Sequence, residues 1–388
     1  MNDSFTCEQI IKQNTLSIDP KVYLQEIVPS YPSTIKRNLS EATPYGIDHV
    51  KAEDVPDSNS SSRKVCIIDS GYDKTHEDLP NDPKMVTGKS FVPGDKYWDI
   101  DEIQHGTHVA GTIAAIGGND TGVKGVIRNG RIKLHIVKVF GPSYGPSASV
   151  TIAAIEECIA EGSNVINMSL GGSGRSDAYQ DAVTAAYEKG VLIFAAAGNT
   201  ASSGYFYPAS YDHVTSVGAV DSHNRHSSFS TYNDKVDLCA PGSRVLSTVP
   251  GGYSTFSGTS MACPHAAGVA ALVWSNFPTL PAEQLRTTLE STATDLPLEN
   301  NNGRDDKYGH GLINARAAYE AIEDSFVVNT IDCNIGGKKV CNETDGCYWF
   351  PNKKKCYECS KMKEERNKGK NFCIRFGCSW NKKSKSCE

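Results

Sequence analysis

The stretch Gly258-Thr259-Ser260-Met261-Ala262-Cys263-Pro264-His265 leads from a glycine and a serine into a long apolar segment that continues to Asn276. The spacing of its apolar residues predicts a helix over residues 260–276, with Ser260 in the first turn. A serine hydroxyl in that position lies near exposed backbone N–H groups and the positive end of the helix dipole. Because serine is also a common N-cap residue, this stretch taken alone favours a capping role.

Two further motifs precede this serine along the chain. Val65-Cys66-Ile67-Ile68-Asp69-Ser70-Gly71 ends an apolar run with an acid, and His105-Gly106-Thr107-His108-Val109-Ala110-Gly111 begins a predicted helix with a histidine. A serine hydroxyl becomes a useful nucleophile when an imidazole accepts its proton, and the imidazole needs a carboxylate to fix its tautomer. An unpaired carboxylate at the end of an apolar strand would be costly, so a paired functional role is favoured for Asp69.

Together with Ala195-Ala196-Ala197-Gly198-Asn199, these motifs resemble the subtilisin-like serine proteases over about residues 40–325. They occur in the chain order Asp, His, Ser that is typical of subtilisin. The resemblance implies a secreted serine endopeptidase, made as a zymogen, that hydrolyses proteins through an acyl-enzyme intermediate formed by Asp69, His105 and Ser260. It also implies that the Asn199 side chain and the Ser260 backbone N–H hold the oxyanion.

The alternation of apolar runs with helical patterns from residue 64 onward predicts an α/β fold. We expect a three-layer sandwich with a mostly parallel central sheet, as in subtilisin-like proteins, plus a small disulfide-rich C-terminal appendage. Buried strands are predicted over residues 65–69, 132–139, 165–170 and 191–197, and helices over residues 105–116, 149–160, 176–189 and 260–276. Asp69 and Asn199 then lie at the carboxyl ends of strands, where such sheets carry their sites.

We predict three regions: a propeptide remnant or N-terminal arm over residues 1–42, a peptidase domain over 43–325 and a cysteine-rich tail over 331–388. The first region contains one strand-like run, Lys21-Val22-Tyr23-Leu24-Gln25-Glu26-Ile27-Val28. The resemblance implies that an inhibitory propeptide ends in such a strand, and that Thr43-Pro44-Tyr45-Gly46-Ile47 begins the mature enzyme. An N-terminal arm packed on the peptidase domain is the alternative.

The tail contains two repeats of four cysteines. Gly346-Cys347-Tyr348-Trp349 in the first corresponds to Gly377-Cys378-Ser379-Trp380 in the second. The two sets are Cys333, Cys341, Cys347 and Cys356, and Cys359, Cys373, Cys378 and Cys387. Such a dense, even set predicts a disulfide framework made in an oxidising compartment, with bridges inside each repeat. A zinc site at Cys356 and Cys359 is the less favoured alternative, because it cuts across the repeat.

The remaining cysteines and two histidines are expected to be structural. Cys263 is predicted to be a small buried hydrophobic residue. His108 and His265 are predicted to be hydrogen-bonded core histidines. The cysteines in other apolar patterns are expected to be mostly reduced: Cys66, Cys158 and Cys239.

The resemblance also implies how a substrate binds. An extended peptide is expected to pair with exposed backbone edges while pockets read alternate side chains. The wall of the primary pocket is assigned to Ser169-Leu170-Gly171-Gly172, and the opposite edge to the loop 140–145 around Gly141. Phe206 is assigned to the pocket floor, and apolar residues are expected before the cleaved bond because no acidic cluster surrounds it.

A structural calcium ion is a further expectation from the resemblance. Calcium prefers oxygen ligands, and the implied ligands are Asp78 and Asn119, with Glu41 as an additional candidate. The loop that carries Asn119 has one extra residue relative to the bacterial pattern. The alternative is that these are turn residues without a metal.

Charge and composition define the expected partners. Residues 331–388 contain 14 Lys and Arg against 7 Asp and Glu, whereas the whole chain has a formal net charge of −6. The basic tail, with Lys353-Lys354-Lys355, suggests contact with anionic polysaccharide or a cell surface. A binding or matrix protein with a protease-like scaffold is therefore the rival hypothesis, although a scaffold needs neither Asp69, His105 nor Ser260.

Otherwise we expect a monomer that acts on peptides or proteins, with no nucleic-acid partner and no transmembrane segment. Secretion is expected, with a vacuole or another secretory-pathway lumen as the alternative. The first residues, Met1-Asn2-Asp3-Ser4-Phe5-Thr6-Cys7, do not form a signal peptide. We therefore expect the natural start of the protein to lie upstream.

Overall fold

The structure is a computed structural model, and it describes residues 19–24, 39–296, 303–329, 347–350, 355–358, 380–381 and 386–387. The chain divides into two compact units, Met1–Tyr319 and Glu320–Glu388. Helix α8 (Ala315–Asn329) runs from the first unit into the second. Within the described ranges, none of the helices combines the length and apolar character that a membrane span requires.

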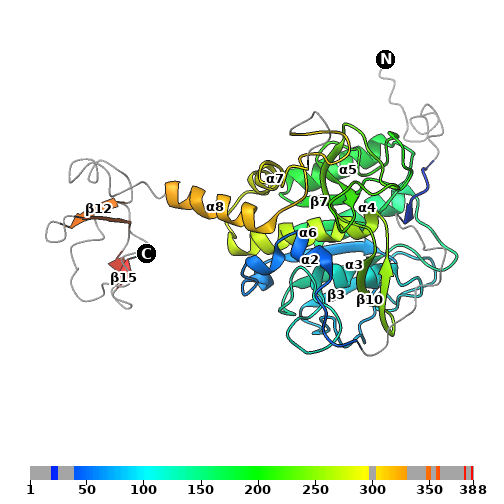
Figure 1. The fold of residues 1–388 in the computed structure, drawn as a ribbon. Coiled ribbons are helices and arrows are strands. Elements are labelled where there is room, and N and C mark those ends of the chain that lie inside the picture. Colours follow the sequence, from blue (N-terminus) through cyan, green and yellow to red (C-terminus); the bar gives the residue numbers. More distant parts are fainter. Residues whose placement is uncertain are drawn as a thin grey trace, which may run out of the picture. The chain divides into compact units, whose positions relative to one another are not determined.

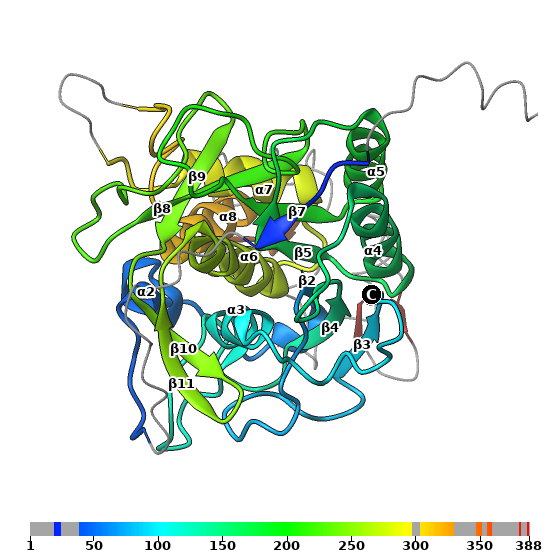
Figure 2. The ribbon, with the colours of Figure 1, turned by 90° about the vertical axis from the view of Figure 1, so that its right-hand side faces the viewer.

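In the first unit (Figure 1), the described residues form a sheet of seven parallel strands in the order β3-β4-β2-β5-β7-β8-β9, all of which are labelled in Figure 2. The strands are β2 (Lys64–Asp69), β3 (Val86–Ser90), β4 (Lys133–Lys138), β5 (Val165–Met168), β7 (Leu192–Ala196), β8 (Val214–Val220) and β9 (Val236–Pro241). Every residue of β5, β7 and β8 is buried. Strands covered on both faces have continuous apolar sequences, which explains why the central ones could be predicted.

Helices cover both faces of this sheet. α4 (Ala148–Ala160) and α5 (Asp177–Glu188) pack together on one face, and α3 (His105–Ala114) and α6 (Thr259–Asn276) on the other (Figure 2). All of α6 from Thr259 to Ser275 is buried. The predicted three-layer α/β sandwich is therefore confirmed.

Shorter elements surround the sandwich. The helices are α2 (Tyr45–His49), α7 (Ala282–Ser291) and the 3₁₀ turns Ala52–Asp54 and Ser60–Ser62. Two antiparallel pairs are β1 (Tyr23–Leu24) with β6 (Leu170–Gly171), and β10 (Val245–Val249) with β11 (Gly252–Phe256). The four predicted helices and four predicted strands agree with the structure within two residues at each end, except that the strand 165–170 is interrupted at Ser169.

A buried disulfide corrects one expectation. Cys66 on β2 and Cys158 on α4 are bonded, with their Cα atoms 5.8 Å apart, although both were expected to be reduced. The helix packs directly on the face of the strand that carries Cys66, and this contact joins residues separated by 92 positions in the sequence. Cys239 and Cys263 are free and buried, as predicted.

The described residues of the tail form two short hairpins. β12 (Cys347–Phe350) pairs with β13 (Lys355–Glu358), and β14 (Trp380–Asn381) pairs with β15 (Ser386–Cys387). Trp349 is paired with Cys356 in the first hairpin, and Trp380 with Cys387 in the second. Corresponding residues of the predicted repeats thus have the same pairing. Five other tail cysteines lie outside the described residues, so their disulfides remain a prediction: Cys333, Cys341, Cys359, Cys373 and Cys378.

Candidate active site

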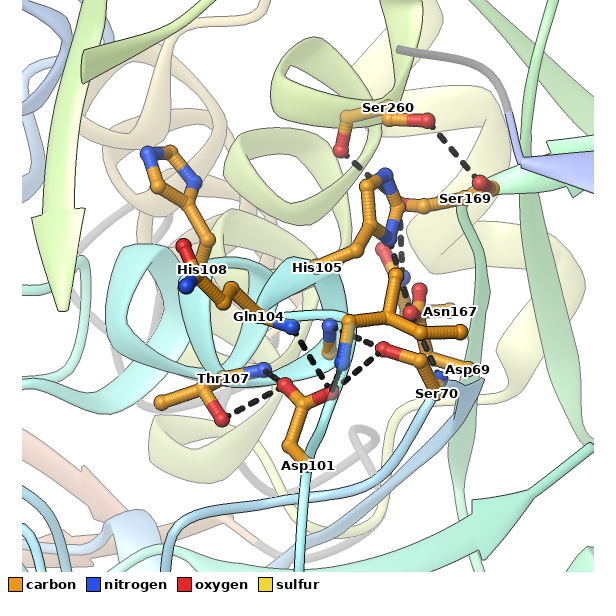
Figure 3. A network of polar contacts seen from close by, with 12 residues as sticks. Asp69, Ser70, Asp101, Gln104, His105, Thr107, His108, Asn167, Ser169 and Ser260 are labelled. Atoms are coloured by element: carbon orange, nitrogen blue, oxygen red, sulfur yellow. Dashed lines mark hydrogen bonds and ion pairs between the residues drawn. The ribbon is translucent and has the colours of Figure 1, made fainter. Parts of the chain in front are cut away.

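The predicted site residues meet at one edge of the central sheet. Asp69 is the last residue of β2, Ser169 follows β5, and Asn199 follows β7. These strands are neighbours and parallel, so their carboxyl ends lie side by side. Helices α3 and α6 begin at the same edge and bring His105 and Ser260 to it (Figure 3).

Asp69 and His105 form a buried pair. The Asp69 Oδ1 atom lies 2.7 Å from His105 Nδ1, and both side chains are 0% exposed. Asp69 Oδ1 also accepts the backbone N–H of Ser70 at 2.7 Å. A carboxylate at Nδ1 favours the tautomer with the proton on that nitrogen, which leaves Nε2 as a proton acceptor. Figure 3 shows the imidazole between Asp69 and Ser260.

Ser260 is held on Ser169 by two hydrogen bonds. The Ser260 hydroxyl donates to the backbone carbonyl of Ser169 at 2.9 Å, and the Ser169 hydroxyl donates to the Ser260 carbonyl at 2.8 Å. Helix α6 begins at Thr259, so Ser260 is its second residue rather than its first. The Ser260 hydroxyl faces the end of β5.

The side-chain amide of Asn199 has one engaged end and one open end. Its Oδ1 atom accepts the Thr259 N–H at 2.9 Å and the Thr259 hydroxyl at 3.0 Å. Its Nδ2 atom is buried and has no hydrogen-bond partner among the described residues. If the amide were rotated by 180°, its NH₂ group would face the two Thr259 donors. The oxygen therefore faces Thr259, and the NH₂ group is the end without a partner. Such a donor can stabilise an oxyanion.

His108 and His265 are core residues, as predicted. His108 Nε2 donates to the Val245 carbonyl at 3.0 Å, and its ring stacks on Phe256 with centroids 4.4 Å apart. Burial lowers the pKa of His108 to about 3. His265 contacts the Met261 carbonyl through Nδ1 at 2.8 Å, and burial lowers its pKa to about 4. Both side chains are therefore neutral at pH 7.

The residues assigned to the primary pocket form a backbone edge that is already paired. Tyr23 of β1 lies opposite Gly171, and Leu24 opposite Leu170 (Figure 2, blue arrow). On the other side of the same segment, the Val22 N–H donates to the Pro146 carbonyl at 3.0 Å. The N-terminal segment 19–24 thus lies between two backbone edges of the first unit, residues 170–172 on one side and Pro146 and Ser147 on the other.

The predicted opposite edge, loop 140–145, lies beside the N-terminal segment, since a Cβ atom added at Gly145 would lie 3.6 Å from the Val22 carbonyl oxygen. Just after this loop, Lys21 forms an antiparallel bridge with Ser147, and the Val22 N–H donates to the Pro146 carbonyl. Within the loop, Gly141 pairs with Tyr144 through two hydrogen bonds of 3.0 Å.

The Phe206 ring lies between Gly171 of the predicted pocket wall and Gly198, the residue before Asn199. A Cβ atom added at Gly198 would lie 2.9 Å from Phe206 Cγ, and one added at Gly171 would lie 3.6 Å from Phe206 Cδ1. The next residue, Tyr207, exchanges two backbone hydrogen bonds with Gly172, at 2.8 and 2.9 Å. The loop is therefore attached to the predicted wall. Ser169 and Leu170, the other residues of the predicted wall, are buried, and the Leu170 side chain packs in the apolar core.

The residues predicted to bind calcium lie together. Asp78 accepts the Asn119 side-chain amide at 2.9 Å and the Val123 N–H at 2.8 Å, while Glu41 accepts the Gly118 and Asn119 N–H groups at 2.6 and 3.1 Å. The Asp78 side chain is completely buried, and burial raises its pKa to about 6. Among the described residues, no group of three His, Cys, Asp or Glu side chains is arranged as a metal site.

One part of the site was not predicted as functional. Asp101 is buried beside the first turn of α3, and its carboxylate contacts Ser70 and Thr107 (Figure 3). The sequence offered one signal, an acid four residues before His105, which is a position suited to capping the helix.

Comparisons with known proteins agree with this geometry. The model of the subtilase family matches residues 60–311. The chain is 46% identical over 286 residues to Subtilisin DY of Bacillus licheniformis, which covers 72% of this chain and 99% of that protein. It is 42% identical over 319 residues to Subtilisin E of Bacillus subtilis (strain 168), covering 80% of this chain and 78% of that protein.

A solved structure is also similar. The crystal structure of the psychrophilic subtilisin-like protease Apa1 from the Antarctic psychrotroph Pseudoalteromonas sp. AS-11 has a TM-score of 0.67 and 32% sequence identity. The match covers 74% of this chain and 99% of that chain.

Proposed function

Because the chain belongs to the subtilase family and is a serine-type endopeptidase, we propose that Ser260 is its nucleophile, His105 its general base and Asp69 the group that orients the imidazole. The observation that carries this assignment is the buried 2.7 Å contact between Asp69 and His105 beside Ser260. Attack on a peptide carbonyl transfers the hydroxyl proton to His105 Nε2, which then protonates the leaving amine. Water hydrolyses the resulting acyl-enzyme by the same proton transfers.

We assign oxyanion stabilisation to Asn199 and to the backbone N–H of Ser260. The open Nδ2 donor of Asn199, with Oδ1 fixed on Thr259, supports this role. A donor held before the reaction needs no reorganisation when negative charge develops on the attacked carbonyl.

The N-terminal segment is proposed to keep the enzyme latent. Residues 19–24 pair with both enzyme edges in the manner of an extended peptide, which supports the zymogen hypothesis over that of a plain arm. Val22 is 3% exposed and packs in the apolar core cluster that contains Phe140 and Ala148. A substrate is therefore proposed to place an apolar side chain in the same position.

Asp19 provides a second attachment for this segment. Its carboxylate accepts the Ser149 N–H at 3.1 Å and the Ser149 hydroxyl at 2.6 Å, at the beginning of α4. Although desolvation raises the pKa of Asp19, hydrogen bonds from Ser149 and Ser147 hold it below its ordinary value. The helix has no cap from its own N-cap residue, Ser147, so the N-terminal segment supplies one.

We propose that the residue before the cleaved bond is small and apolar. The Phe206 ring occupies the space between Gly171 and Gly198, which supports a shallow pocket. A large aromatic side chain would have to displace that ring, whereas alanine would not.

Calcium binding is proposed at Asp78, Asn119 and Glu41. The fit rests on a buried carboxylate, Asp78, that makes no ion pair with Lys or Arg among the described residues, next to a second carboxylate. A bound calcium ion would balance the charge of Asp78, add to the 3.5 Å ion pair of Glu41 with Lys124, and link the loop to the residues just before α2. The donor set consists of oxygens, provided that Asn119 presents its carbonyl oxygen to the ion.

We propose secretion, or residence in the lumen of a secretory organelle. The buried Cys66–Cys158 bond and the eight tail cysteines are typical of an oxidising compartment. In this setting the basic tail is proposed to hold an active, monomeric enzyme on anionic polysaccharide or a cell surface.

The nucleophile can be tested with a fluorophosphonate probe of serine hydrolases. We expect the full chain to be labelled in calcium and the Ser260→Ala variant not to be labelled. If folded wild-type protein remains unlabelled even after prolonged incubation with a trace of an added protease, the assignment of Ser260 is wrong.

The proposal that the N-terminal segment keeps the enzyme latent can be tested with variants of two neighbouring residues in that segment. Val22 is buried, whereas its neighbour Tyr23 is 63% exposed. We expect Val22→Ser to increase the initial rate of labelling and Tyr23→Ser to leave it unchanged. Equal rates for both variants and the wild type would show that this segment does not cover the site.

A further inference from the structure

A buried carboxylate outside the proposed triad is saturated with hydrogen bonds. Asp101 is 4% exposed. Its Oδ1 atom accepts the Ser70 hydroxyl at 2.8 Å and the N–H groups of Ile103 and Gln104 at 3.2 and 3.0 Å. Its Oδ2 atom accepts the N–H and the hydroxyl of Thr107 at 2.8 and 2.7 Å. Five donors therefore fix both oxygens of this carboxylate.

These bonds connect the end of β2 with the start of α3. Ser70 follows Asp69, and Gly106 follows His105. The Ser70 hydroxyl donates to Asp101 and accepts the Gly106 N–H at 2.8 Å. A second hydrogen-bonded link thus runs beside the Asp69–His105 bond, one residue further along both elements (Figure 3).

The backbones approach closely at the same place. A Cβ atom added at Gly106 would lie 2.3 Å from the Gly71 carbonyl oxygen. The N-cap residue of α3, Gln104, makes no capping bond with its own side chain. Ser70 and Asp101 satisfy the N–H groups of Gly106 and Thr107 in its place, and a negative charge at this end is favourable to the helix dipole.

A buried lysine holds the loop before Asp101 in place. Lys138 is 1% exposed and is paired with Asp69 in the register of β2 and β4. Its ammonium donates to the Ile100 carbonyl at 2.9 Å and forms a 2.7 Å ion pair with Asp95. Asp101 is therefore fixed by Lys138, which holds the loop before it, and by its own hydrogen bonds to the start of α3.

We propose that Asp101 is a positioning residue for catalysis, acting through Ser70 and Thr107 to hold the first turn of α3 so that His105 stays bonded to Asp69. The proposal rests on the assignment of His105 as the general base. A carboxylate is required because both oxygens accept from N–H groups. The Asp101→Asn amide would present its NH₂ either to Thr107 or to Gln104, so one donor would face another in both orientations.

Two variants test this in the full chain. Asp101→Asn removes a charge, whereas Ser70→Ala breaks the link without a change in charge. We expect both to lower kcat about 10- to 100-fold, since small misplacements of a catalytic group have effects of that size. KM should stay within about two-fold, because neither residue contacts the bound segment. The acid limb of the pH profile of kcat/KM should move to lower pH in both, because a weaker bond to Asp69 makes His105 a weaker base.

Glu102→Gln is the matched control. It removes a charge one residue away, from a side chain that is 53% exposed and lies 3.8 Å from the Lys138 ammonium. Because Lys138 keeps its 2.7 Å ion pair with Asp95 and its hydrogen bond to the Ile100 carbonyl, this variant should behave as the wild type. If Asp101→Asn and Ser70→Ala lower only the melting temperature, with wild-type kcat per active site and an unmoved acid limb, Asp101 is merely structural and the proposal is wrong.

An NMR measurement is independent of activity. In the Ser260→Ala background, the low-field ¹H signal of the proton between His105 and Asp69 should shift or broaden when Asp101→Asn is added, but not with Glu102→Gln. An unchanged signal would overturn the proposal. Because this readout does not need turnover, an inactive wild type would refute the proposed function and leave the positioning test intact.

Discussion

The Cys66–Cys158 bond gives a stability prediction with a magnitude. It closes a loop of 92 residues, and both cysteines are fully buried. In the chain-entropy model, a loop of that length constrains the unfolded state by about 4.6 kcal/mol at 25 °C. The described part of the first unit has about 280 residues, and each contributes about 2.1 cal mol⁻¹ K⁻¹ to the entropy of unfolding. The shift in melting temperature is the lost free energy divided by this total entropy. Removing the bond should therefore lower the melting temperature by about 8 °C.

The assay is calorimetry of the Cys66→Ala/Cys158→Ala variant in the Ser260→Ala background, which prevents self-digestion. All variants are heated at one scan rate, because proteases often unfold irreversibly. The matched control is Cys239→Ala/Cys263→Ala, which removes two buried sulfur atoms and no cross-link. Destabilisation by the loss of buried sulfur atoms then occurs in both double variants. Destabilisation by the loss of the cross-link occurs only in Cys66→Ala/Cys158→Ala.

Two results would refute this reasoning. The first is a decrease in melting temperature that does not exceed that of the control pair. The second is alkylation of both Cys66 and Cys158 in unreduced, denatured protein, which would show that the thiols are free.

Three further predictions follow from the site. Calcium should raise the melting temperature of the wild type and of Asp120→Asn, an exposed neighbour in the same loop, but not that of Asp78→Asn; an equal response of all three would exclude the proposed ligands. Phe206→Gly should raise kcat/KM for peptides with phenylalanine before the cleaved bond relative to alanine, as measured with a peptide series, whereas Tyr205→Ala should not. Burial lowers the pKa of His108 from its ordinary 6.5 to about 3, so the unfolded chain binds a proton that the folded chain does not. Stability should therefore be highest above pH 6.5 and fall as the pH decreases towards 3, which a melting series checks; a flat series would contradict this.

The sequence predicted those parts of the molecule that local patterns determine. The central strands have apolar runs with no polar face, and α3 and α6 start at the residues that the motifs indicate, within one position. The side chains at these ends were correctly brought together, because parallel strands and their helices share one edge.

The residues that were missed depend on contacts between distant segments. Cys66 and Cys158 are 92 positions apart, and neither has a neighbouring pattern that distinguishes a bonded from a reduced cysteine. Asp101 lies in a loop, and its hydrogen bond with Ser70, 31 positions earlier in the sequence, cannot be read from the local pattern. Hydrogen-bond partners of this kind become visible only when the chain has folded.

Helix α4 connects the proposed latent state with the strand that carries Asp69. In its first turn, Ser149 donates two hydrogen bonds to the carboxylate of Asp19 in the N-terminal segment. Near its last turn, Cys158 is bonded to Cys66, three residues before Asp69 on β2. If the segment leaves on activation, the helix loses its cap, but the disulfide still fixes its other end to the strand. A covalent link between α4 and β2 therefore remains in place whether or not the N-terminal segment is bound.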